Sequence, residues 1–397
     1  MATVLTAPPN GFAGDWQISL KTPGGALPFK LSIAFDNQKP IAQVFNGAEC
    51  IDVDVQSIND HVLRLDIAHY DSRLQLELAD NGTLLTGHWE KRRSKSDVAV
   101  LEAHGVRIVA AEVDAPDEFI GRWQVQFTDE ESPAVGIFQK VEENYVAGTF
   151  LTTTGDYRYL FGFVRNGQLK LSCFDGAHAF LFTAQLDQTG NLQGEFWSGN
   201  WYHDTWEAKR DANASLPSGF EEVHIVQPNN LSSLRFPDLD GKPTDLAQLF
   251  SGGSAAVVEI FGSWCPNCHD EAALLTELHE AYNQRGLRVI GLAFELTGNF
   301  ERDAKQVKRY VERFNVSYPV LIAGLSDKQK ASEQLPMLDR IRSFPTTLFV
   351  DQSGTVRAVY SGFSGPATGD AHTKLKQQFI DIIERLIMDG GNSAPRG

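Results

Sequence analysis

Cysteine is scarce in this chain, with four residues in 397: Cys50, Cys173, Cys265 and Cys268. So few cysteines exclude a small disulfide-stapled fold, because such folds replace a large core with a dense cysteine framework. Cys50 and Cys173 stand alone in strand-like sequence, and we predict that each is a small buried hydrophobic side chain. The other two stand three positions apart, a spacing with its own chemistry.

Basic residues and long apolar runs are also lacking. The chain has 35 Lys and Arg against 51 Asp and Glu, a formal net charge of −16. An acidic surface repels phosphate backbones, so we expect no nucleic-acid partner. No stretch approaches the roughly 18 apolar residues of a membrane-spanning helix, so we expect no transmembrane segment. Residues 1–10 hold neither Lys, Arg nor an apolar core and do not read as an export signal.

The first half of the chain repeats itself. Trp16 and Trp123 stand in similar pentapeptides, GDWQI and GRWQV, 107 positions apart (123 − 16). Three further matches follow in the same order at nearly the same offset. These matches predict a tandem duplication, with one copy over residues 10–106 and the other over residues 117–212.

Both copies alternate apolar and polar residues in short runs, as in 62–67 and 169–173. Turn residues such as those at 80–82 and 166–167 separate the runs. Period-two alternation between turns predicts antiparallel strands in hairpins, arranged as a sandwich or a barrel. The pattern leaves open whether the copies form two barrels or one joint sheet system.

The pattern changes after a polar stretch at 213–225, which we interpret as a linker. Residues 226–390 alternate between strands and helices. We expect strands at 257–261, 287–294, 318–322, 346–350 and 355–360, and helices at 271–282, 300–314 and 374–388. This order predicts a central sheet covered on both faces. The chain is therefore expected to be multidomain, with a duplicated all-β region followed by an α/β domain.

A CxxC motif follows the expected strand at 257–261. Residues i and i+3 share one face of a helix, so Cys265 and Cys268 can close a disulfide on its first turn. Pro266 suits that turn, where its missing N–H is not needed. The free N–H groups and the dipole at a helix N-terminus favour a thiolate, which is the attacking species in exchange. We therefore expect Cys265 to be the nucleophile and Cys268 the resolving thiol.

Residues 226–390 resemble the thioredoxin superfamily, and specifically TlpA/ResA-like thiol–disulfide oxidoreductases. Three motifs in order carry the resemblance: FPDLDGK at 236–242, EIFGSWC at 259–265 and FPTT at 344–347. It implies a thioredoxin fold, protein thiols and disulfides as substrates, and an upstream redox partner. It implies no cofactor and no metal, because the two cysteines are the redox group. It also implies a periplasmic or cell-envelope location, with the cytoplasm as the alternative.

The resemblance implies roles for individual residues. Glu259 matches a buried acid that relays a proton for the resolving cysteine, and burial should raise its pKa. Glu271 matches an active-site glutamate of the ResA-like group. Pro345 matches the cis-proline beside the disulfide, which leaves the backbone of Phe344 to an extended substrate. Substrate contacts are also implied for the residues around the cysteines, namely Trp264, Pro266 and Asn267.

Other interpretations stay open. CPNCH also spells a c-type haem attachment motif, so the chain could instead be a binding or scaffold module whose CxxC is a redox latch or a haem- or metal-handling site. No second Cys/His pair has zinc-ligand spacing, and we expect His269 to be a solvated helix residue. We expect the protein to act as a reductant. However, the order Pro–Asn between the cysteines departs from the common pattern, which places Pro second, and leaves the direction of electron flow undecided.

Overall fold

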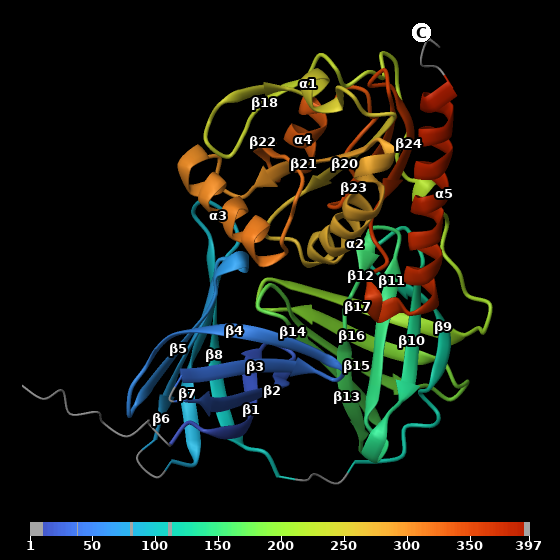
Figure 1. Cartoon of the computed structure of the whole chain (residues 1–397). Helices are drawn as coiled ribbons and strands as arrows, with labels where there is room; N and C mark the ends of the chain where they lie inside the picture. Colours follow the sequence, from blue (N-terminus) through green and yellow to red (C-terminus); the bar gives the residue numbers. More distant parts are fainter. Residues whose placement is uncertain (1–10, 38, 80–81, 110–112, 393–397) are drawn as a thin grey trace, which may run out of the picture. The chain divides into compact units, whose positions relative to one another are not determined.

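The structure is a computed structural model that describes residues 11–37, 39–79, 82–109 and 113–392 (Figure 1). These residues form two compact units. The first holds the chain up to 149 together with 159–214, and the second holds 150–158 and the chain from 215 onward. Residues 1–10, on which the export-signal argument rests, and residue 10 as the start of the first copy lie outside the described residues.

The first copy folds into a closed antiparallel barrel in which each strand pairs with the next and the last pairs with the first. Its elements are β1 (Gly14–Thr22), β2 (Gly25–Asp36), β3 (Lys39–Asn46), β4 (Glu49–Ile58), β5 (Val62–Ile67), η1 (Ala68–Tyr70), β6 (Ser72–Leu78), β7 (Leu84–Arg92) and β8 (Val98–Arg107). Alternate residues of each strand point inward, as Trp16, Ile18 and Leu20 do in β1. The period-two alternation in the sequence thus becomes the inner and outer faces of a barrel.

The second copy forms its own antiparallel sheet, in the order β10-β9-β17-β16-β15-β14-β13-β11-β12, which an additional β10–β11 pairing closes. Its elements are β9 (Gly121–Phe127), β10 (Ala134–Lys140), η2 (Glu142–Asn144), β11 (Val146–Thr152), β12 (Gly155–Asp156), β13 (Leu160–Arg165), β14 (Gln168–Phe174), β15 (Ala179–Leu186), β16 (Leu192–Ser198) and β17 (Tyr202–Arg210). The all-β prediction is confirmed, and the copies form two barrel-like sheets rather than one joint sheet.

The two copies share a detail at corresponding places. In each, the tryptophan indole N–H donates to the carbonyl four residues earlier, at 2.8 Å for Trp16 and 3.0 Å for Trp123. An arginine from the last strand stacks on each ring, Arg107 at 3.7 Å and Arg210 at 4.3 Å from the ring centroid. A cation over a tryptophan face is attractive, so the matching pentapeptides mark the same structural position in both sheets.

Within the first unit, the turn between β14 and β15 packs against the barrel. The Phe174 ring stacks on inward-facing Phe29 at 4.2 Å and meets the edge of Trp89 at 5.4 Å. The Asn46 side chain bonds both the backbone N–H and the carbonyl of Phe174, each at 3.0 Å. One hydrophobic core therefore includes residues from both copies.

The expectation for the isolated cysteines is half wrong. Cys173 is buried, as predicted, but Cys50 is exposed. Cys50 is the second residue of β4. It points outward with Asp52, whereas Val53 points inward. Apolar character alone did not tell which face of the strand Cys50 occupies.

The second unit is built on a sheet in the order β22-β21-β20-β23-β24. Its elements are η3 (Gly219–Glu221), β18 (Arg235–Pro237), β19 (Pro243–Asp245), α1 (Leu246–Phe250), β20 (Ala255–Phe261), α2 (Pro266–Tyr282), η4 (Asn283–Arg285), β21 (Leu287–Glu295), α3 (Phe300–Arg313), β22 (Val320–Leu325), α4 (Lys328–Gln334), β23 (Thr346–Asp351), β24 (Val356–Ser361), η5 (Pro366–Thr368) and α5 (Asp370–Asn392). Central β20 pairs in parallel with β21 and antiparallel with β23.

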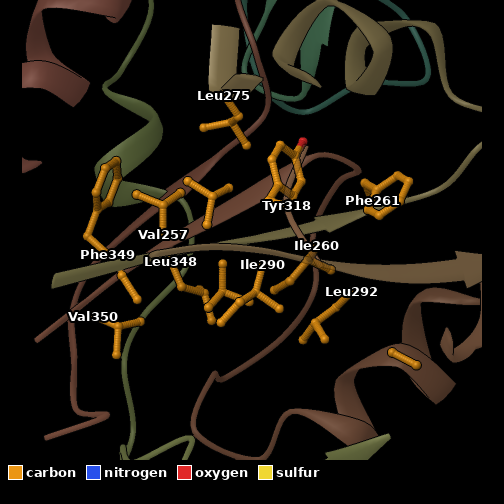
Figure 2. Close-up of a cluster of buried hydrophobic side chains, with 14 of the residues drawn as sticks. Val257, Ile260, Phe261, Leu275, Ile290, Leu292, Tyr318, Leu348, Phe349 and Val350 are labelled. Atoms are coloured by element: carbon orange, nitrogen blue, oxygen red, sulfur yellow. The ribbon is translucent and has the colours of Figure 1, made fainter. Parts of the chain in front are cut away.

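Every residue of β20 is buried, which requires cover on both faces of the sheet. Figure 2 shows part of this core, where Val257 and Ile260 of β20 lie among side chains of β21 and β23 and Leu275 of α2. The predicted strand and helix order is confirmed. The stretch interpreted as a linker contains η3, whose Phe220 ring packs 4.8 Å from Tyr360. Among the described residues, no helix combines the length and apolar character needed to cross a bilayer.

Candidate redox site

The CxxC motif lies where β20 ends and α2 begins. Cys265 is the N-cap of α2, in an extended conformation, and its Sγ accepts the backbone N–H of Cys268 at 3.3 Å. The sulfur thus occupies the place of a capping oxygen, facing the unpaired N–H groups of the first turn. Cys265 is 5% exposed and Cys268 is fully buried, and both are free thiols. Of the two cysteines, only Cys265 keeps any exposed surface.

The loop before β23 lies beside the motif. The Phe344–Pro345 peptide bond is cis. The Cys265 thiol donates to the Phe344 carbonyl oxygen at 3.3 Å. The ring of Trp264 meets that of Phe344 edge-on at 5.6 Å, while its indole N–H donates to the Phe294 carbonyl at 2.9 Å. The structure therefore brings these widely separated residues together.

Glu259 is buried in the middle of β20, as the sequence suggested. Its Oε2 accepts the hydroxyl of Tyr318 at 3.2 Å. Burial raises the pKa of Glu259 well above its usual range, and the nearby Glu271 carboxyl adds to that effect. Glu259 therefore holds its proton more tightly than an ordinary glutamate, and its carboxylate is a stronger base once that proton is lost.

Glu271 is a second buried carboxyl, on α2. The Thr347 hydroxyl donates to its Oε1, and Thr347 lies opposite Glu259 in the β20–β23 ladder. Burial raises the pKa of Glu271 to about 8, against the lowering effect of that hydrogen bond. Both predicted acids therefore contact Thr347, the last residue of the FPTT motif, for which no such role was predicted.

Cys268 lies among these groups. Burial raises the pKa of its thiol well above the usual range, and its hydrogen bond with Cys265 acts in the same direction. The Tyr310 hydroxyl donates to the Cys268 carbonyl at 3.4 Å. A thiol in this setting keeps its proton unless a neighbouring base removes it.

A third buried carboxyl, Glu295, was missed in the sequence. It ends β21, directly after an apolar run, and its two oxygens accept the Ser263 backbone N–H and hydroxyl, each at 2.8 Å. Burial raises the pKa of Glu295 to about 8. Glu295 thereby holds the loop that leads from β20 to Cys265.

The expectation that His269 is solvated is wrong. The residue is 3% exposed, and its ring packs 5.2 Å from that of Tyr310 and 4.5 Å from that of Phe314. Its Nε2 lies 2.8 Å from the Ser263 carbonyl oxygen, which can only accept, so Nε2 carries the proton. This ring stabilises the loop and does not point toward solvent as an available haem ligand would.

Pro266 and Asn267, predicted to meet substrate, contact another part of the second unit. The Pro266 carbonyl accepts Nη1 of Arg158 at 3.4 Å, and the Asn267 amide donates to the Asp156 carbonyl at 3.4 Å. Neither partner was predicted.

A hollow of about 720 Å³ lies elsewhere in the second unit. Residues of β24 and α5 contribute to its lining and neither cysteine does, so the CxxC motif lies outside it.

The comparisons with known proteins agree with this geometry. Residues 225–375 match the family described as Redoxin. A thiol-disulfide oxidoreductase ResA of Halalkalibacterium halodurans is 24% identical over 149 residues, which covers 37% of this chain and 71% of that protein. A ResA of Geobacillus thermodenitrificans is 25% identical over 125 residues, covering 32% and 63%. The chain thus spans about two thirds of the length of these relatives.

Among solved structures, a thioredoxin-family thiol:disulfide interchange protein of Chlorobium tepidum is 25% identical, with a TM-score of 0.31, over 41% of this chain and 99% of that one. A secreted disulfide oxidoreductase of Mycobacterium tuberculosis is 20% identical, with a TM-score of 0.28, over 36% and 92%. Scores this low carry no argument about function. The family match, the relatives and the CxxC geometry together place the C-terminal domain among the TlpA/ResA-like protein-disulfide oxidoreductases of the thioredoxin superfamily.

Proposed function

We propose that the whole chain is a thiol–disulfide oxidoreductase whose Cys265–Cys268 pair reduces disulfides of protein substrates. The carrying observation is the position of Cys265. Its sulfur caps α2, accepts the Cys268 N–H at 3.3 Å and is the less buried of the two cysteine sulfurs. N–H groups directed at a sulfur stabilise negative charge there, which an attacking or departing thiolate requires.

The reaction proceeds in two exchanges. The Cys265 thiolate attacks one sulfur of the substrate disulfide, so that a mixed disulfide forms and the other substrate sulfur leaves as a thiolate. Cys268 then attacks Sγ of Cys265, which breaks the mixed disulfide and closes the Cys265–Cys268 bond. In total, two electrons and two protons pass from the enzyme dithiol to the substrate, which ends as two thiols.

Glu259 is the proposed base of the second exchange. The buried Cys268 thiol must lose its proton before it attacks, and the raised pKa of the thiol calls for a base whose pKa is also raised. Glu271 is proposed as an auxiliary acid, because its charge raises the pKa of Glu259. Both acids also contact Thr347. Glu271 accepts a hydrogen bond from the Thr347 hydroxyl, and Glu259 pairs with Thr347 in the β20–β23 ladder.

Substrate binding is proposed at the rim of Cys265. Half-buried Trp264 and buried Phe344 form an aromatic pair there. The Phe344 carbonyl, which accepts the Cys265 thiol in this structure, becomes available to a substrate backbone once that thiol ionises. Pro345 fixes the turn of this loop. Pro266 and Asn267 complete the rim between the cysteines.

The proposed setting follows from the resemblance to TlpA/ResA-like proteins. The protein would work in the periplasm or cell envelope, with an upstream partner that returns electrons to the Cys265–Cys268 disulfide. The duplicated β region would recruit partners or hold the chain in an assembly.

Trapping of the mixed disulfide tests this proposal. Cys268→Ser should accumulate a stable adduct with insulin chains or glutathione, because no second thiol is present to release it. Cys265→Ser should form none. Cys50→Ser is the matched control, since it removes an exposed cysteine outside the motif and should leave insulin reduction unchanged. An adduct on Cys268 in Cys265→Ser, or insulin reduction that survives this change, would contradict the proposal; intact mass in a Cys50→Ser background excludes adducts on Cys50.

A further inference from the structure

The second compact unit contains a segment that precedes the linker by many residues. Residues 153–158 follow β11, turn at Gly155 and include β12, and they are grouped with the chain from 215 onward. The Arg342 guanidinium, next to the cis-proline loop, donates to the Thr153 hydroxyl at 3.0 Å. Gly155 has a φ of 148°, which residues with a Cβ rarely adopt, and a Cβ there would lie 2.0 Å from Nδ2 of Asn267 and displace that amide. The segment therefore borders the redox motif.

Arg158 is the residue of this segment that contacts the motif itself. Its side chain is 8% exposed. Nη1 donates to the carbonyl of Pro266, the first residue of α2, and pairs with the carboxylate of Asp270 one turn further along. One guanidinium thus holds the first turn of α2 at two points, on either side of Cys268.

Asp156 fixes Arg158 in turn. Its Oδ1 accepts the Arg158 backbone N–H at 2.7 Å, and its Oδ2 accepts the Gly365 N–H at 2.5 Å. Arg158 has a φ of 59°, in the left-handed region that residues with a Cβ rarely adopt. Such a conformation persists where the surroundings enforce it, and it often marks a functional position.

We propose that Arg158 is a positioning residue of the redox site, which holds the Pro266–Asn267 turn in the shape of the dithiol state and so sets the equilibrium constant of the Cys265–Cys268 pair. The inference rests on the proposed function. In this structure both thiols are free while the Arg158 contacts are formed. Closing the disulfide brings the two sulfurs to about 2.05 Å, across the turn that the contacts of Arg158 hold.

The direction of the effect follows. By the proposal, the contacts of Arg158 stabilise the dithiol, and a more stable dithiol makes the disulfide the stronger oxidant. In the exchange of enzyme disulfide with two glutathione thiols, one S–S bond breaks in the enzyme and one forms in glutathione disulfide. Without Arg158, this equilibrium should shift toward enzyme disulfide.

The test is the glutathione equilibrium constant of the full chain. Arg158→Ala should favour the enzyme disulfide by at least about tenfold, which corresponds to about 30 mV. Arg158→Lys keeps the charge and should lie between Arg158→Ala and wild type. The effect of Arg158→Ala on the equilibrium constant should be smaller in an Asp270→Asn background, because one of the contacts of Arg158 with α2 is its ion pair with Asp270. Arg64→Ala, which removes an exposed arginine from β5, should match wild type.

The outcomes separate the two proposals. If wild type shows no reversible couple, the proposed function fails. If wild type shows one and a folded Arg158→Ala stays within about twofold of its constant, or shifts toward the dithiol, only the role of Arg158 is overturned. If Arg158→Ala does not fold, Arg158→Lys and Asp270→Asn are measured in its place. A glutathione equilibrium constant equal to that of wild type in both variants would overturn the positioning role of Arg158.

Discussion

The phenolic hydroxyl of Tyr318 donates to Glu259 across 3.2 Å, in the interior of the C-terminal domain. Burial raises the pKa of Glu259, whereas this hydrogen bond stabilises its charged form and lowers the pKa. The two effects oppose each other. Tyr318 therefore keeps Glu259 able to release its proton as well as to accept one, which a proton relay requires.

Glu259→Gln should slow the release of a mixed disulfide on Cys265 by about a hundredfold, the lower range for loss of a general base. The first exchange should change little, because Cys265 does not depend on that base. Acid quenching, alkylation and intact mass would follow the glutathione adduct over time. Glu280→Gln, which changes an exposed glutamate of α2 outside the redox site, is the control. Equal adduct lifetimes in Glu259→Gln and wild type would remove Glu259 from the relay.

The raised pKa of Glu271 predicts that the stability of the protein depends on pH. Its pKa is about 8 in the folded protein and about 4.3 when unfolded. Between these values the folded state keeps a proton that the unfolded state has lost, so the free energy of unfolding falls as pH rises from about 5 to 8.

Urea unfolding at several pH values tests this dependence. Glu271→Gln cannot titrate, so its stability relative to wild type should improve with rising pH, by at most about 1.4 kcal/mol per unit. Below about pH 4 the two proteins should follow parallel curves. Parallel curves up to pH 8 would contradict a raised pKa at Glu271.

The hydrogen bonds of Glu295 predict that its replacement lowers the stability of the fold rather than acting on catalysis. Glu295→Ala leaves the buried N–H and hydroxyl of Ser263 without their acceptor, which should cost about 1–3 kcal/mol of unfolding free energy. Glu295→Gln keeps an acceptor and a similar shape and should cost less. Denaturant midpoints measure both. Equal losses for the two variants would contradict this prediction, because the acceptor oxygen that Gln keeps would then stabilise nothing.

The packing of Phe174, from the second β copy, against the barrel of the first predicts that the two copies stabilise each other. Phe174→Ala removes a fully buried ring from between Phe29 and Trp89 and should cost about 3–5 kcal/mol. Phe45→Ala, at a half-buried site of β3, should cost clearly less. Thermal unfolding of the full chain compares them. A smaller loss for Phe174→Ala than for Phe45→Ala would contradict a shared core.

Local patterns predicted much of this protein. The period-two runs identified the strands, the pair Trp16 and Trp123 identified the duplication, and the CxxC after an apolar strand identified the α/β domain. Each of these signals lies within a few residues of the element that it describes. Glu259 was singled out by the resemblance to TlpA/ResA-like proteins, from its place six residues before Cys265.

Contacts between distant segments were not predicted. His269 is buried because Tyr310 and Phe314 of a later helix region cover it, and its own sequence neighbours gave no sign of that. Arg158 reaches the Pro266 carbonyl from 108 residues away. Nothing in a single sequence indicates such a pairing. Glu295 did carry a signal, as an acid that ends an apolar run, and could have been proposed.

The most direct test of the central claim is the redox equilibrium of the full chain. The protein would be poised in glutathione or dithiothreitol buffers, alkylated, and its free thiols counted by intact mass. We predict one reversible two-electron couple that Cys265→Ser abolishes, with a potential near or below about −270 mV, as expected of a reductant. A potential near about −120 mV would instead indicate a disulfide donor. The absence of any reversible two-thiol couple would contradict the account.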